Sequence, residues 1–216
     1  MDFIKQISKI LIFTAVIWCC AFTASVAQSK SYKKAKPAPV SAQLAYFTKL
    51  ANQAGVNFTF PEGFKELPAV NNENFSFDYA MSIPGQDFEL WFQVHSLKQN
   101  WASYDLVKNI TGKTLANPDS TYMQAARANA TALSDDPKYF IRPLSATVLE
   151  QYNADAGKTF LFNLADLPEA RHYKYALLIA IQKNHVGYIM AVCLTNSKGA
   201  DFFKNINRAR NCIKFR

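Results

Sequence analysis

The sequence lacks the short motifs by which most catalytic sites are recognised. It has three histidines among 216 residues, and because none stands four residues from another or within H-E-x-x-H, no local zinc site is indicated. The G-x-S-x-G elbow is absent, and both G-K-T tripeptides lack the earlier glycine of a phosphate-binding loop. Serine hydrolase, zinc and nucleotide chemistry therefore have no support, and we predict neither a metal nor a cofactor.

Cysteine is also scarce, with four residues and no C-x-x-C motif, so thioredoxin-type redox chemistry is not indicated. Two cysteines lie in the apolar N-terminal segment, which leaves Cys193 and Cys212. In an oxidising compartment this pair could form one disulfide, worth roughly 3 kcal/mol in the chain-entropy model. A pair of buried free thiols is the alternative, and the sequence leaves both open.

The first 27 residues have the pattern of a cleavable signal peptide. Lys5 and Lys9 precede an uncharged stretch from Ile10 to Ala24, whose length of about 15 residues is short of the roughly 20 that span a bilayer. Small residues three and one positions before a cut follow in Ser25-Val26-Ala27. We therefore expect export, to the periplasm or the outside of the cell, with an uncleaved N-terminal anchor as the alternative.

Positive charge is concentrated near the N-terminus. The whole chain carries +8; residues 1–27 remove two lysines and one aspartate, which leaves +7, and four more lysines lie in residues 28–40. The part from Ser41 onward therefore carries only +3, so a strongly basic face for nucleic acid is not supported.

Residues 28–40 are predicted to form a basic, proline-containing tether, because lysines and prolines leave little apolar surface to bury. A charge run this short is usually only solvated. The functional alternative is weak contact with an anionic membrane surface or cell-wall polymer through Lys30, Lys33, Lys34 and Lys36.

The remaining residues, 41–216, have a length suited to a single domain. Apolar positions at helical spacing predict a helix that begins after Ser41 and ends at Gly55. Further helices are predicted over 118–133, 145–152 and 199–209.

The strongest β pattern lies in residues 75–97. Apolar residues alternate with smaller or polar ones on both sides of Pro84-Gly85, which predicts an antiparallel hairpin with one apolar and one mostly polar face. The runs 159–164, 173–182 and 186–194 are apolar at nearly every position, which is typical of central strands covered on both faces. We predict an α+β fold, an antiparallel β-sheet flanked by α-helices.

The segment Phe58-Thr59-Phe60-Pro61-Glu62-Gly63-Phe64, with the hairpin that follows it, resembles the opening of the Mog1/PsbP/DcrB-like superfamily, whose members typically begin with an F-x-x-P-x-G-[FW] turn. The later strand pair and terminal helix are also similar to that architecture. The resemblance covers most of residues 56–216 and implies a Mog1/PsbP-like sandwich with a non-enzymatic accessory or binding role. It places no ligand-binding residue.

One residue departs from the alternation of the hairpin. Trp91 falls on the polar side of its strand, with Glu89 and His95. A helix that covers this face would make Trp91 a core residue. Alternatively, Trp91 is an aromatic platform for a sugar, a peptide or a partner's side chain, extended by Trp101 and Tyr104 in the following loop.

These observations favour an exported, non-enzymatic binding or accessory domain whose partner is an envelope protein or polymer. A hydrolase of envelope or extracellular polymer, with carboxylates that converge in the fold, is the main alternative. A structural envelope component that makes contact through its basic tether is the third.

Overall fold

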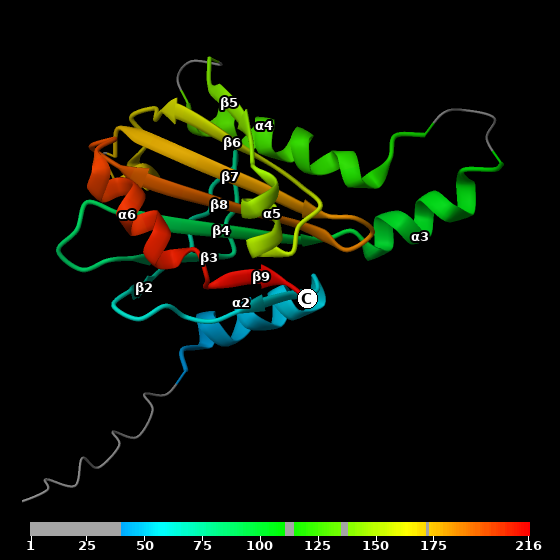
Figure 1. Cartoon of the computed structure of the whole chain (residues 1–216), viewed down its shortest axis with the longest axis horizontal. Coiled ribbons are helices and arrows are strands. Elements are labelled where there is room, and N and C mark those ends of the chain that lie inside the picture. The colour runs from blue at the N-terminus through cyan, green and yellow to red at the C-terminus, as the bar shows by residue number, and fades with distance from the viewer. Residues whose placement is uncertain (1–39, 111–114, 135–137, 172) are drawn as a thin grey trace, which may run out of the picture. The chain divides into compact units, whose positions relative to one another are not determined.

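The computed structural model describes residues 40–110, 115–134, 138–171 and 173–216. The predicted signal peptide (1–27) and the tether lysines lie outside these residues. The described chain has the predicted α+β fold, with a large antiparallel sheet flanked by helices (Figure 1). Among its helices, none is long and apolar enough to cross a membrane.

The elements follow one another in a mixed order along the chain. They are α2 (Ala42–Gln53), β1 (Val56–Phe58), β2 (Lys65–Leu67), β3 (Tyr79–Ser82), β4 (Glu89–Ser96), α3 (Lys98–Val107), the 3₁₀ turn η1 (Pro118–Ser120), α4 (Thr121–Leu133), β5 (Phe140–Pro143), α5 (Ala146–Tyr152), β6 (Ala156–Asn163), the 3₁₀ turn η2 (Pro168–Ala170), β7 (Tyr175–Lys183), β8 (Gly187–Thr195), α6 (Ala200–Ala209) and β9 (Ile213–Phe215).

The main sheet has the strand order β2-β3-β4-β8-β7-β6-β5, and β1 pairs with β9 in a separate two-stranded ribbon. All these pairs are antiparallel. The ladder between β4 and β8 joins the two halves of the chain, because it pairs Glu89 with Leu194 at one end and Ser96 with Gly187 at the other.

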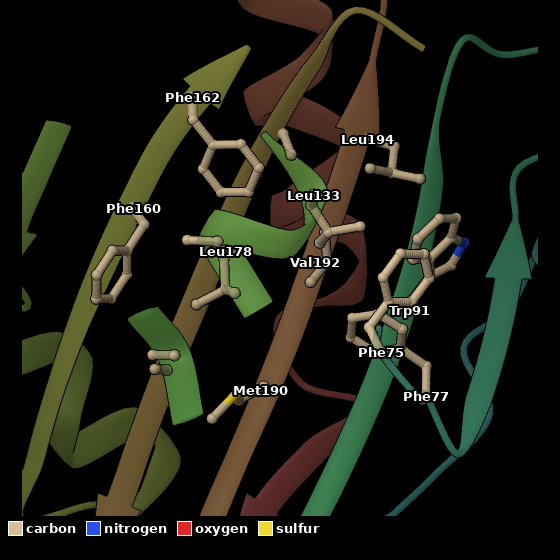
Figure 2. Packing of buried hydrophobic residues seen from close by; sticks show 14 of the residues in the cluster. Phe75, Phe77, Trp91, Leu133, Phe160, Phe162, Leu178, Met190, Val192 and Leu194 are labelled. Carbon is tan, nitrogen blue, oxygen red and sulfur yellow. The ribbon is translucent and has the colours of Figure 1, made fainter. Parts of the chain in front are cut away.

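Each face of the main sheet is covered by its own apolar cluster. On one face, Phe47 of α2, Phe202 of α6 and Phe215 of β9 pack with Tyr79, Leu90 and Phe92 of the sheet. On the opposite face, α4 contributes Leu133 and two buried alanines. Figure 2 shows Leu133 beside the strand residues Phe160, Phe162, Leu178, Met190, Val192 and Leu194.

The first helix forms as its sequence predicts. The Ser41 side chain accepts a hydrogen bond from the Leu44 amide at 3.0 Å, which satisfies one of the free donors of the first turn. Gly55, which follows the C-cap residue Ala54, has φ 71°, a left-handed conformation that glycine adopts without strain. The hairpin β7–β8, the helix α4 and the terminal helix α6 also confirm their predicted positions.

The predicted hairpin is correct in its pairing but wrong in its first strand, which begins at Tyr79 rather than Phe75. The Asp78 carboxylate accepts the Val94 amide at 2.8 Å, so a side chain replaces the main-chain acceptor at this point. The residues before Asp78 lie outside the β3–β4 ladder. Phe75 and Phe77 therefore pack on the face of the sheet that carries Trp91 and not on the face that carries Tyr79.

The residues after β4 form a helix, α3, where a loop that contains Trp101 and Tyr104 was expected. Two short edge strands, β2 and β5, were also not predicted. β2 has three residues and β5 has four, and each strand includes exposed positions. Neither therefore shows the alternation of buried and exposed residues by which a strand is recognised.

The core packing yields a first test. Leu178 is fully buried on β7, so Leu178→Ala should lower the free energy of unfolding by about 2–5 kcal/mol, through lost burial and the cavity that remains. Leu106→Ala, at a side chain that is 72% exposed, should change it by less than about 0.5 kcal/mol. Urea denaturation of both variants measures this, and equal effects would contradict the assignment of the core.

Candidate functional site

The structure separates the five predicted binding residues into two groups at opposite ends of β4. Glu89 is the first residue of the strand and His95 is near its end, which places them roughly 20 Å apart at the rise of an extended strand. Trp91 lies near Glu89, whereas Trp101 and Tyr104 follow in α3. The predicted continuous surface is therefore not formed.

Trp91 is a core residue and not a platform. Its side chain is 0% exposed, and its ring lies 5.3 Å from that of Phe77 and 6.3 Å from that of Phe75, measured between centroids. Figure 2 shows the three rings packed together. The structure therefore shows the alternative in which Trp91 is a core residue. Phe75 and Phe77 cover its side chain.

Glu89 is the acceptor for the polar atom of Trp91. The indole Nε1–H donates to Glu89 Oε2 at 3.1 Å, and Arg171 Nη1 donates to Glu89 Oε1 at 2.9 Å. Glu89 is only 4% exposed, and a buried carboxylate is tolerated when a cation and hydrogen bonds satisfy it. Glu89 therefore fixes the end of the sheet and has no face open to a ligand.

His95 is exposed on β4, where its ring stacks on Tyr188 at 5.0 Å. The neighbouring carboxyl is that of Asp78. Burial raises the pKa of Asp78, and the hydrogen bond from Val94 and the charge of His95 act against that rise. The charge of Asp78 in turn adds to the effect of burial in raising the pKa of Tyr188.

Trp101 and Tyr104 belong to an aromatic cluster at the base of α3. The Trp101 ring stacks on His185 at 3.8 Å and meets Tyr104 edge-on at 5.3 Å. Asp119 Oδ1 accepts both Trp101 Nε1–H at 2.9 Å and the His185 amide at 3.0 Å. Sequence reasoning missed His185 and Asp119, since the contact joins three segments that are distant in the chain.

A groove of about 310 Å³ lies beside this cluster, between α3 and the segment that leads into α4. Its walls are mostly apolar or aromatic, and the lining residues carry no formal charge: Asn100, Ser103, Tyr104, Val107, Leu115, Ala116, Pro118 and Thr121. The adjoining surface of α3 is apolar as well, with Leu106 72% exposed and Ile110, just beyond the helix, 77% exposed.

Cys193 and Cys212 are free, buried thiols in this structure. Both line a small apolar cavity of about 30 Å³, together with Tyr152 and Ile206. Burial, with the neighbouring Cys212 as a second cause, raises the pKa of the Cys193 thiol, and burial raises that of Cys212 to about 12. Both side chains are therefore protonated and unreactive near neutral pH.

No metal-binding group of three or more His, Cys, Asp or Glu side chains is found within residues 40–110, 115–134, 138–171 and 173–216.

The assignment to the Mog1/PsbP/DcrB-like superfamily stays a prediction.

The raised pKa of Asp78 leads to a pH-dependent prediction. A carboxyl that holds its proton more tightly in the folded state contributes most to stability when protonated, and this contribution falls as the pH rises through the raised pKa. Asp78→Asn cannot ionise but keeps an acceptor for the Val94 amide. We expect the stability of this variant, relative to the wild type, to be higher at about pH 7 than at about pH 3. Urea denaturation at both pH values measures the difference, and a difference that does not change with pH would contradict it.

The cysteines lead to a chemical prediction. Under native conditions iodoacetamide should leave Cys193 and Cys212 unmodified, because both thiols are buried and protonated. After denaturation without a reductant, mass spectrometry of the chain that begins at residue 28 should show two adducts. An unmodified denatured chain would instead indicate a disulfide.

Comparison with known proteins finds no family model that matches the chain, no similar curated protein and no similar solved structure.

Proposed function

We propose that this protein is a non-enzymatic binding domain that holds an apolar segment of a partner protein against α3 and the adjoining groove. The observation that carries the proposal is the exposure of Leu106 (72%), Val107 (40%) and Ile110 (77%) on one helix and its end. These three side chains lie within five residues of one another, and clustered exposed apolar side chains are typical of interaction sites.

The placement of α3 supports this role. A helix that packs on a protein core normally buries an apolar stripe, but α3 has no buried residue. In Figure 1 it extends away from the sheet beyond the end of the β7–β8 hairpin. Trp101 packs partly against the core cluster, but the exposed side chains of Leu106 and Val107 do not, and a bound partner would give them a function.

The base of α3 is held in place before any partner binds. Trp101 is stacked on His185 and bonded to Asp119, and the Leu97 amide donates to the Val186 carbonyl at 2.9 Å. A surface fixed in its bound geometry loses less conformational entropy on association. This arrangement suits a recognition surface better than a freely moving arm would.

The charge of the surface favours a protein over a nucleic acid or a membrane. No charged residue lines the groove, and on α3 the Asp105 carboxylate is 2.8 Å from the Lys108 ammonium. Nucleic acids and anionic lipid surfaces are bound through clusters of basic side chains. An uncharged apolar segment, such as one face of an amphipathic helix, is the complementary occupant.

The positions of the carboxylates do not favour the hydrolase alternative. A glycosidase pair requires two carboxyl groups that face a common cleft. Asp87 and Asp201 line a hollow of about 200 Å³ beside α6, but the Asp87 oxygens accept hydrogen bonds from Thr195 and Asn196. Glu89 is bound to Arg171 and Trp91. The carboxylates of Asp87 and Glu89 therefore have structural partners.

Site-specific photo-crosslinking tests the proposal. A photoreactive residue is placed at Ser103, in the groove, and at Lys204, on the exposed side of α6. A protein that crosslinks only from Ser103 is identified, purified and titrated against wild type and the double variant Leu106→Gln, Ile110→Gln. We expect the double variant to weaken binding by about tenfold or more, because two apolar side chains lose their burial.

Phe203→Gln provides the matched control, since Phe203 is 49% exposed but lies on α6. It should leave the dissociation constant unchanged, and both variants should unfold like the wild type. Self-association of the wild type alone, or binding to anionic lipid vesicles that Leu106→Gln, Ile110→Gln abolishes, would overturn the proposal in favour of a dimer or membrane surface. Equal binding by the wild type and the double variant would overturn it as well.

A further inference from the structure

A second hollow lies at the opposite end of the sheet from α3. It has a volume of about 690 Å³, within the roughly 300–1,000 Å³ typical of ligand clefts. The end of β6, the start of β7 and the segment after β8 form its walls. Its lining residues are Asn163, Leu164, Ala165, Asp166, Tyr173, Lys174, Tyr175 and Lys198.

The cleft combines positive charge with aromatic surface. The Lys198 ammonium lies 4.1 Å from the centroid of the Tyr175 ring, a distance at which a cation–π contact forms. Lys174 is exposed on the same rim. Together with Asp166, the rim therefore carries two cations and one carboxylate.

Neutral hydrogen-bonding groups lie between these charges. Burial raises the pKa of Tyr173 to about 12; the charges of Glu89 and Asp87 add to this effect, and Arg171 opposes it. The phenol therefore stays protonated at neutral pH. The exposed Asn163 amide, which is paired with Tyr175 in the β6–β7 ladder, adds donors and an acceptor to the lining of the cleft.

A hydrogen-bonded network lies behind the cleft. Arg171, two residues before Tyr173, has a left-handed backbone (φ 50°) and donates to the buried Glu89. Glu89 in turn accepts the indole N–H of Trp91. Glu89 and Trp91, two of the residues that the sequence suggested for binding, thus belong to a network that anchors Arg171 at the end of η2.

We propose that this cleft binds an acidic oligosaccharide, a chain of sugar rings that bear carboxylates. Such a ligand places carboxylates beside Lys174 and Lys198 and hydroxyl groups beside Tyr173 and Asn163. The cleft is open to solvent, which suits a polymer whose chain continues at both ends. This site is separate from the α3 surface and does not depend on the proposed protein partner.

The balance of charges disfavours a compact multivalent anion or a nucleic acid. The carboxylate of Asp166 beside two lysines leaves a single excess positive charge on the lining residues, whereas nucleic acid binding neutralises several phosphates. A sugar acid has one charge per ring and many hydroxyls, which matches the sparse charge and the neutral polar groups of this cleft.

Calorimetric titration of the chain that begins at residue 28 with trigalacturonic acid tests the proposal. The double variant Lys174→Gln, Lys198→Gln should weaken binding by about tenfold or more, because two charge-assisted contacts are lost. The matched control Lys204→Gln, Lys214→Gln removes the same charge at exposed positions of α6 and β9 and should bind like the wild type. Tyr175→Leu, which removes the ring beneath Lys198, should also weaken binding.

Maltotriose, a neutral sugar, and inorganic phosphate, an anion without sugar rings, test separately whether the cleft recognises the sugar or the charge. We expect the wild type to bind each of them at least about tenfold more weakly than trigalacturonic acid, since each offers only part of the recognised chemistry. Equal loss in the two lysine variants would show a nonspecific charge effect and overturn the proposal. Phosphate binding as tight as that of the sugar acid, or no binding of trigalacturonic acid, would overturn it as well.

Discussion

The ladder between β4 and β8 is the contact on which the rest of the structure depends. It joins the strands of the N-terminal half to those of the C-terminal half through eight residue pairs, from Glu89–Leu194 to Ser96–Gly187. Without it, β2-β3-β4 and β8-β7-β6-β5 would be two small sheets with open edges at β4 and β8. Because its partners are about 100 residues apart, loop closure makes this pairing costly, and burial on both faces of the joined sheet compensates.

The burial of both faces explains the aromatic residues of the first hairpin. Leu90 and Phe92 point to the cluster beneath α2 and α6, and Trp91, between them, points to the opposite cluster. Phe75 and Phe77 reach that second face because Asp78 takes over the Val94 amide and the chain leaves the strand there. Trp91 in turn requires a buried acceptor, Glu89, which then requires Arg171. The buried Trp91 is thus part of a polar network in which Glu89 and Arg171 are 82 positions apart in the sequence.

Local patterns predicted the elements whose signals are local. The cap at Ser41, the hairpin turn at Pro84-Gly85 and the apolar runs of β7 and β8 depend on neighbours in the sequence, and they were predicted within a few residues. Helix α3 was not predicted, because none of its residues is buried and its sequence lacks the periodic apolar positions by which a helix is recognised. The Trp101–His185–Asp119 cluster was equally inaccessible, since it joins α3, η1 and the β7–β8 hairpin.

The same packing determines where binding can occur on the described domain. Both faces of the sheet are filled with side chains, and the cavity between the sheet and α6 has a volume of only about 30 Å³, which is close to that of one water molecule. The hollows proposed as binding sites accordingly lie at the ends of the strands, where loops and helix termini meet and side chains are not required for the core. The sequence left open whether Trp91 forms one site with Trp101 or belongs to the core, because it could not show which face of β4 is covered. The structure places Trp101 at one end of the sheet, and at the other end the buried Trp91 donates to Glu89, which also accepts a hydrogen bond from Arg171.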